Sequence, residues 1–206
     1  MKRIALLVLS TGVAVLLGYG LARLAPDPRR ADEHIVAVEP AHALPSFTLS
    51  GAHGPIANAQ LRGSWWWVVF GYTSCPDICP TTLASLAAVQ RQLVTTGHAA
   101  PRVLFVSVDP VRDSPAQLQR YVSYFERDFV GATGTPVELE RFAAALGARF
   151  HVPQQTQVQN YSVGHTTTVM LVDPEGRLVA RIVPPLDAPR VARAYLQRWA
   201  EVQRQG

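Results

Sequence analysis

The sequence predicts an α/β domain whose central mixed sheet is flanked by helices, behind a single N-terminal transmembrane helix. Three observations support this fold class. Two short apolar runs have the composition of buried strands, helical segments with clear start signals alternate with them, and the last third of the chain predicts a strand hairpin followed by a helix. At 206 residues, the chain is long enough for one such domain and one membrane segment, but too short for two ordinary domains.

The first 25 residues predict a membrane anchor. Residues 4–22 carry no charge, and this stretch of 19 residues is close to the roughly 20 that a helix needs to cross a bilayer. A signal peptide cleaved after Ala25 would place Arg23 where a small residue is required, so an uncleaved anchor is favoured over a signal peptide. Basic residues on the two flanks balance each other, and their count does not settle the orientation.

Between the anchor and the domain, residues 26–43 mix prolines, charges and small residues without a clear period, which is typical of a tether. The folded domain is therefore expected to span residues 44–206. The formal net charge is +4, but three basic residues flank the apolar run, so the remainder of the chain is nearly neutral. Because there is no basic stripe, nucleic acid is not expected as a partner.

Two buried strands are predicted at residues 65–70 (WWWVVF) and 103–108 (VLFVSV). Both runs are continuously apolar and rich in β-branched and aromatic residues, as is typical of central parallel strands that are buried on both faces. The three tryptophans of the first run are assigned to the core and the edge of a strand, and no chemistry is assigned to them. Between the runs, apolar residues at helical spacing predict a helix and so complete a β-α-β unit: Leu83, Leu86, Ala87 and Leu93.

Two further helices carry start signals. Ser114 is suited to cap a helix, Pro115 to its first position and Gln117 to completing a capping box. The same signal recurs at Thr135, and that helix is predicted to stop at Gly147.

In the last third, residues 167–172, the turn DPEG and residues 177–183 predict an antiparallel hairpin. The final helix is predicted from its apolar positions: Val191, Ala194, Tyr195, Trp199 and Val202. A β-α-β half followed by β-β-α is the thioredoxin arrangement, here with extra helical material between the halves.

The two cysteines of the chain, Cys75 and Cys79, lie where the first buried strand meets the first helix. Free backbone N–H groups and the helix dipole at this point favour a lowered thiol pKa. Residues four apart on a helix have β-carbons about 5–6 Å apart, wider than the roughly 3.8 Å of a relaxed disulfide. The pair is therefore suited either to a redox disulfide, after a local shift, or to a metal. A purely structural bridge would contribute little, because the loop that it closes is short.

A metal site needs a third ligand, and His165 is the best placed histidine. It stands just before the strand predicted at residue 167, in a loop that lies against the cysteine-bearing helix end in a thioredoxin-like fold. The alternative is a capping or core-edge histidine. The other histidines lie in the tether, in an early hairpin turn, or in loops: His34, His42, His53, His98 and His151. Two thiolates and an imidazole suit Cu(I) and, with an added ligand, Cu(II). A structural zinc site and an iron–sulfur cluster each require more protein ligands than these three.

Three segments, GYTSCPDICPTT, VSVDPVRDSP and YSVGHTT, resemble in order and separation the Sco/SenC family of copper chaperones for cytochrome c oxidase. The resemblance covers residues 44–206. It implies copper held by Cys75, Cys79 and His165, received from an upstream copper donor and delivered to the CuA centre of oxidase subunit II. It also implies a single-pass protein of the bacterial inner membrane, with its C-terminal domain facing the periplasm, that is not an enzyme.

Two details around this ligand set stay open. The family usually has an acidic residue before the histidine, where this chain has Gly164, so the electrostatic surroundings of His165 differ from the family pattern. Asp109 and Asp113 follow the second buried strand at the same sheet edge as the cysteines and are candidates for orienting or neutralising the site from outside the ligand set. The alternative is that Asp113 and Ser114 simply start a helix.

The main alternative function is a thiol-disulfide oxidoreductase that reduces the cysteines of the oxidase copper site. It would use a redox-active disulfide between Cys75 and Cys79 and would not need His165. A peroxiredoxin-type peroxidase is disfavoured, because those enzymes have a threonine three residues before the reactive cysteine. This chain has Tyr72 and Pro76 at those positions.

Overall fold

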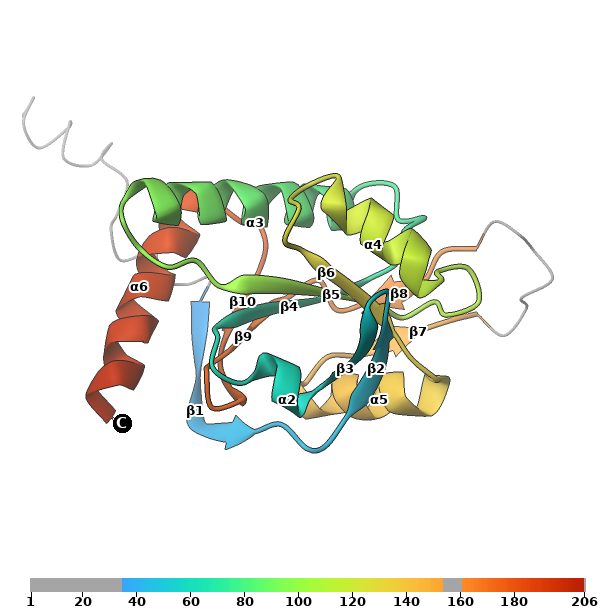
Figure 1. Cartoon of the computed structure of the whole chain (residues 1–206), viewed down its shortest axis with the longest axis horizontal. Coiled ribbons are helices and arrows are strands. Elements are labelled where there is room, and N and C mark those ends of the chain that lie inside the picture. Colours follow the sequence, from blue (N-terminus) through green and yellow to red (C-terminus); the bar gives the residue numbers. More distant parts are fainter. Residues whose placement is uncertain (1–34, 154–160, 206) are drawn as a thin grey trace, which may run out of the picture. The chain divides into compact units, whose positions relative to one another are not determined.

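A mixed eight-stranded sheet with helices on both faces organises the computed structural model, which describes residues 35–153 and 161–205 (Figure 1). The predicted anchor, residues 1–25, and the first part of the predicted tether lie outside the described residues. Among the described residues, no helix combines the length and the apolar character that crossing a membrane requires. The described residues form one compact unit.

The strands of the main sheet lie in the order β1-β10-β9-β4-β5-β6-β2-β3. In chain order they are β1 (Ile35–Ala43), β2 (Thr48–Gly51), β3 (Gly54–Ala57), β4 (Trp66–Gly71), β5 (Arg102–Ser107), β6 (Val130–Thr133), β9 (Val169–Val172) and β10 (Arg177–Ile182). A separate two-stranded sheet pairs β7 (Phe150–His151) with β8 (Gly164–His165). The helices are α2 (Asn58–Leu61), α3 (Ile78–Thr95), α4 (Pro115–Ser123), α5 (Pro136–Ala145) and α6 (Ala188–Gln205). Figure 1 shows α3 and α4 over one face of the main sheet and α5 over the other.

The centre of the sheet matches the prediction. β4 and β5 run parallel, from the Trp66–Arg102 pair to the Gly71–Ser107 pair, and β6 continues the parallel arrangement beyond β5. Trp66 and Trp67 are fully buried, as expected for core residues. Burying a large apolar side chain contributes about 1.5–3 kcal/mol, so the fully buried residues of these strands contribute substantially to the stability of the domain.

The predicted hairpin is also present, as β9 and β10, and β9 pairs antiparallel with β4. A parallel β-α-β unit joined to an antiparallel hairpin gives the expected thioredoxin-like mixed sheet. The start signals are confirmed in detail. The Ser114 hydroxyl accepts a hydrogen bond from the Gln117 backbone N–H, and Thr135 and Glu138 repeat the capping box. Gly147, with φ of +70°, follows the end of α5.

Two sequence predictions are wrong. Residues 35–43, assigned to the tether, form strand β1, which pairs with β10 from Ile35–Ile182 to Ala43–Arg177. This edge strand is mostly exposed and has no regular apolar alternation, so its backbone hydrogen bonds to β10 rather than its side chains define it. Trp199, one of the apolar positions from which the final helix was predicted, is 41% exposed.

Candidate metal centre

The two cysteines lie at the carboxyl edge of the parallel strands. Cys75 is in the loop between β4 and α3, where its backbone N–H donates to the Tyr72 carbonyl over 3.2 Å. Cys79 is the second residue of α3. Both thiols are free and buried, with exposed fractions of 9% for Cys75 and 2% for Cys79. Both cysteines are therefore buried and lie where the sequence predicted them, at the junction of the first buried strand and the first helix.

His165 reaches the same point from a segment 86 residues further along the chain. Strand β8 holds it by pairing with β7, where Phe150 is opposite His165. The next residue, Thr166, strengthens this attachment, because its backbone N–H donates to the Arg149 carbonyl over 2.8 Å and its hydroxyl accepts from the Arg149 N–H over 2.9 Å.

The imidazole of His165 is oriented by its own neighbour. Its Nδ1 lies 3.1 Å from the Thr166 carbonyl oxygen, which can only accept, so Nδ1 carries the proton. In the neutral ring, the lone pair is then on Nε2, which lies 3.5 Å from the sulfur of Cys79. A backbone carbonyl that fixes the tautomer in this way is the usual support of a metal-binding histidine.

The ligand atoms of Cys75, Cys79 and His165 all lie within 4.8 Å of one another. Within residues 35–153 and 161–205, no other histidine, cysteine or carboxylate joins this group. The structure therefore brings together the three residues that the sequence singled out, while the other described histidines lie elsewhere. Two soft sulfurs and one imidazole suit a soft ion such as Cu(I), and they fall short of the four protein ligands of a structural zinc site.

The predicted lowering of the thiol pKa is wrong for Cys79 in the metal-free protein. Burial raises the pKa of the Cys79 thiol well above its ordinary value, and this outweighs the opposing effect of a backbone hydrogen bond from Tyr72. The helix start alone does not set the ionisation, because the sulfur has lost its contact with water. Burial also lowers the pKa of His165, so the imidazole is neutral and free to bind a metal at neutral pH.

Gly71 makes room for the Cys79 sulfur. A β-carbon at this position would lie 2.8 Å from the sulfur and 2.6 Å from Cε2 of the Phe105 ring. Real β-carbons essentially never approach other atoms so closely, and Phe105 is fully buried in the core. The absence of a side chain on the last residue of β4 is therefore a packing requirement of the site.

Asp113 ties the cysteine loop to the end of β5. Its carboxylate accepts from the Thr73 backbone N–H over 2.9 Å, from the Thr73 hydroxyl, and from the Ser107 hydroxyl over 2.5 Å. It is 1% exposed. Of the two interpretations of Asp113, its contact with the cysteine loop agrees with an orienting role. Ser114 alone is the cap of α4. Sequence reasoning did not identify the partner, because Thr73 and Asp113 are 40 residues apart.

Asp109 is also 1% exposed and lies outside the group of three candidate ligands. Its carboxylate is bound by the Arg112 guanidinium and by the Tyr161 hydroxyl, which donates over 2.7 Å. Its influence on the metal centre stays a prediction. Neither Arg112 nor Tyr161 was singled out from the sequence, and only their contacts in the fold reveal them.

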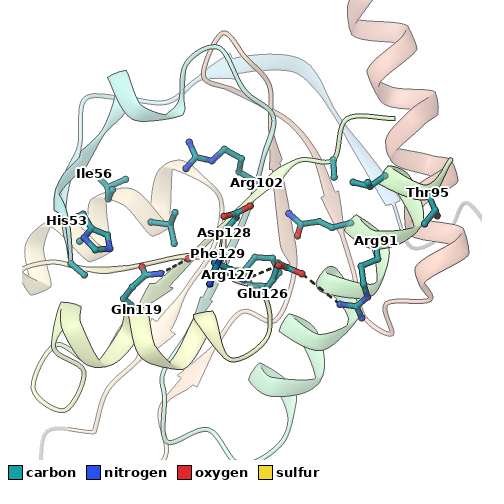
Figure 2. Close-up of a pocket in the computed structure, with 16 residues that line it drawn as sticks. His53, Ile56, Arg91, Thr95, Arg102, Gln119, Glu126, Arg127, Asp128 and Phe129 are labelled. Carbon is teal, nitrogen blue, oxygen red and sulfur yellow. Dashed lines mark hydrogen bonds and ion pairs between the residues drawn. The ribbon is translucent and has the colours of Figure 1, made fainter. Parts of the chain in front are cut away.

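A large cavity of about 1020 Å³ lies elsewhere, between the C-terminal half of α3, the start of β5 and the segment before β6 (Figure 2). Its residues include Arg102, which opens β5, whereas the cysteines lie beyond the ends of the parallel strands. Around it, Arg91 and Glu126 form an ion pair of 3.9 Å, and the Gln119 amide donates to the Phe129 carbonyl over 2.9 Å. This cavity is not part of the candidate metal centre.

The fold and the site together define a thioredoxin-like protein in which a Cys-x-x-x-Cys pair meets a histidine from a distant loop. The family model SCO1/SenC matches residues 36–201, and the chain belongs to this family. A putative copper-binding protein of Stutzerimonas stutzeri is 38% identical over 143 residues, which cover 69% of this chain and 70% of that protein.

Solved structures agree in fold. Apo Sco1 from Thermus thermophilus has a TM-score of 0.69 at 33% identity, covering 77% of this chain and 92% of that one. Yeast Sco1 with copper bound has a TM-score of 0.70 at 30% identity, covering 75% of this chain and 87% of that one. The chain spans about half the length of the mitochondrial SCO2 proteins that it matches, with 50% of the bovine and 58% of the yeast protein covered.

In the metal-free, reduced protein, we expect the His165 imidazole to titrate below its ordinary pKa of 6.5, because burial disfavours the imidazolium. The unfolded chain then takes up this proton at a higher pH than the folded chain. The contribution of His165 to the free energy of unfolding is therefore fully present above pH 6.5 and decreases as the pH falls below it. NMR titration of the ring gives the pKa, and His165→Gln should lose this part of the pH dependence. A midpoint above 6.5 would contradict the prediction.

Gly71→Ala should destabilise the domain by about 1–3 kcal/mol, the usual cost of overpacking, and should displace the Cys79 sulfur. Gly164→Ala is the matched control, because a β-carbon there meets nothing within 4 Å. Denaturant unfolding measures the first effect, and the rate of thiol labelling in the metal-free protein measures the second. Equal stabilities of the two variants would show that the site can absorb a side chain at residue 71.

Proposed function

We propose that this protein is a membrane-anchored copper chaperone that binds Cu(I) or Cu(II) through Cys75, Cys79 and His165 and delivers it to the CuA centre of cytochrome c oxidase. The observation that carries the proposal is the convergence of two thiols and one oriented imidazole within 4.8 Å, on the fold of the SCO1/SenC family. The copper-bound yeast relative supports copper as the metal. In this proposal the protein transfers a metal ion and is not an enzyme.

The donor set explains why copper can be both held and released. Two thiolates and an imidazole give a three-coordinate site for Cu(I), and an added ligand extends it to Cu(II). Each thiol loses its proton when the metal binds, so loading releases protons. Transfer to subunit II then proceeds by ligand exchange, in which thiolates of the acceptor replace those of the donor one at a time. No electron transfer is needed for this step.

The proposed setting is the bacterial inner membrane. The uncharged stretch at residues 4–22 supports a single-pass anchor, with the C-terminal domain on the periplasmic side, and an upstream donor supplies the copper. From this position the domain would meet the part of subunit II that carries the CuA centre, on the same side of the membrane.

Metal analysis of the reduced protein after exposure to Cu(I) tests the proposal. The unmodified protein should retain one copper per chain, and Cys75→Ser and Cys79→Ser should each lose it. His165→Ala should weaken binding and block oxidase assembly in cells. His151→Ala is the matched control, since His151 is exposed and its strand is paired with that of His165. Unchanged copper binding and unchanged oxidase assembly in His165→Ala would reject the chaperone function.

A second candidate is a thiol-disulfide oxidoreductase that reduces the cysteines of the oxidase copper site. The observation in its favour is that the Cys75 and Cys79 sulfurs are both free and within 4.8 Å of each other. A local shift would close a disulfide between them, with two electrons and two protons passing to the acceptor disulfide. The raised pKa of the buried Cys79 thiol weighs against this function, because the thiolate is the nucleophile of the exchange.

The two candidates differ in their need for the imidazole. A reductase should act on a disulfide-bonded peptide of the CuA site equally well with and without His165. For the chaperone, we expect slow reduction of this peptide by the metal-free protein, and copper transfer to the reduced peptide that depends on His165. Fast peptide reduction that survives His165→Ala, combined with absent copper transfer, would favour the reductase.

A further inference from the structure

Four side chains from three separate segments meet beside His165, and we call them the Arg112 cluster: Tyr72, Asp109, Arg112 and Tyr161. Tyr72 follows β4 and precedes the cysteines, Asp109 and Arg112 lie between β5 and α4, and Tyr161 lies four residues before His165. None of the four belongs to the group of candidate metal ligands.

The guanidinium of Arg112 is the centre of this cluster. Its Nε donates to one carboxylate oxygen of Asp109, and its Nη1 donates to the Tyr161 backbone carbonyl over 3.0 Å. The Tyr161 hydroxyl closes the ring of contacts by donating to the other oxygen of Asp109. The guanidinium carbon also lies 3.7 Å from the centroid of the Tyr161 ring, a cation–π distance. Arg112 therefore holds both the backbone and the side chain of Tyr161.

The cluster also contacts the cysteine side of the site. The Arg112 guanidinium lies over the Tyr72 ring at 5.5 Å, and that ring and the His165 imidazole form a T-shaped pair with 5.9 Å between their centroids. The Tyr72 carbonyl accepts the hydrogen bond from the Cys75 backbone N–H. Arg112 thus contacts the segment that leads to the cysteines and the segment that leads to the histidine.

The burial of the cluster indicates that its geometry is fixed. The Asp109 side chain is 1% exposed and that of Arg112 is 20% exposed. The Nη2 atom of Arg112 is buried and finds no partner among the described residues. An unused buried donor costs stability, so this guanidinium is not placed solely to maximise its hydrogen bonds. The planar, forked guanidinium contacts the Asp109 carboxylate, the Tyr161 carbonyl and the two tyrosine rings at the same time. A lysine ammonium cannot reproduce this set of contacts.

We propose that Arg112 is a positioning residue that fixes the His165 segment against the cysteine loop and thereby stabilises the Cu(II) form more than the Cu(I) form. This inference rests on the proposed copper function. Two thiolates alone are good ligands for Cu(I), whereas Cu(II) depends on the imidazole nitrogen. Loosening the His165 segment therefore weakens Cu(II) binding selectively. Removing the support of a metal ligand typically costs 10–100-fold in affinity.

The test compares Arg112→Lys with Arg120→Lys in the full-length, reduced protein. Arg120 is exposed on α4 and serves as the matched control. In Arg112→Lys we expect Cu(II) affinity to fall at least about tenfold, Cu(I) affinity to change less than about threefold, and the nitrogen coupling in the Cu(II) electron paramagnetic resonance spectrum to weaken. Tyr161→Phe, which removes only the hydrogen bond to Asp109, should shift the same spectrum in the same direction and keeps the test valid where Arg112→Lys fails to fold.

Unchanged Cu(II) affinity, or equal losses for Cu(I) and Cu(II), would overturn the inference. A metal-free measurement separates its failure from that of the proposed function. Hydrogen exchange at the backbone amides of residues 163–166 should be faster by about tenfold or more in Arg112→Lys than in Arg120→Lys. If the unmodified protein binds no copper, the proposed function fails, and with it the Cu(II) preference. Equal hydrogen-exchange rates at these amides in the two variants would contradict a positioning role for Arg112, whatever metal the protein binds.

Discussion

The parallel pairing of β4 with β5 is the constraint on which the rest of the site depends. It places Gly71 beside Ser107 at one edge of the sheet, so the loops that follow the two strands begin at the same level. Asp113 then joins these loops by accepting hydrogen bonds from Thr73 and Ser107. The carboxyl edge of parallel strands is the usual place for binding sites in open α/β sheets. Here the strand pairing gives that edge a fixed position for both thiols.

Burial and the helix start act in opposite directions on the second of these thiols. The first turn of α3 offers free backbone N–H groups, which stabilise negative charge. Cys79 is nevertheless only 2% exposed, and burial raises the pKa of its thiol. A protonated, covered thiol is a poor nucleophile and is protected from oxidation, yet a soft metal ion can still displace its proton. This balance suits a metal carrier better than a reductase.

The sequence was sufficient for the features that depend on local patterns. The apolar runs of β4 and β5, the capping boxes at Ser114 and Thr135, and the hairpin of β9 and β10 all follow from residues that are close in the chain. The convergence of His165 with the cysteines also agreed with expectation, because three motifs in a fixed order indicated a known arrangement.

The remaining features depend on partners that are distant in the chain. Strand β1 has an irregular pattern and exists through its pairing with β10, and the two-residue strands β7 and β8 are too short to leave a periodic signal. The contacts of Arg112 and Asp113 join residues about 40 to 50 positions apart. Likewise, the pKa of Cys79 was predicted in the wrong direction because the local rule considers the helix dipole, whereas burial is a property of the whole core.

The supports of the three candidate ligands differ in strength, and this difference has a consequence for the proposed transfer of copper. Cys79 is held in a long helix and is 2% exposed, whereas His165 is half-buried on a two-residue strand with an exposed glycine beside it. An incoming ligand of the acceptor therefore meets the imidazole side of the site first. Displacing the imidazole leaves the metal on two thiolates, a stable arrangement for Cu(I). In the proposed transfer, the exchange would therefore begin at His165 and end at Cys79, and the copper ion would stay bound to the protein through a sulfur until the acceptor held it.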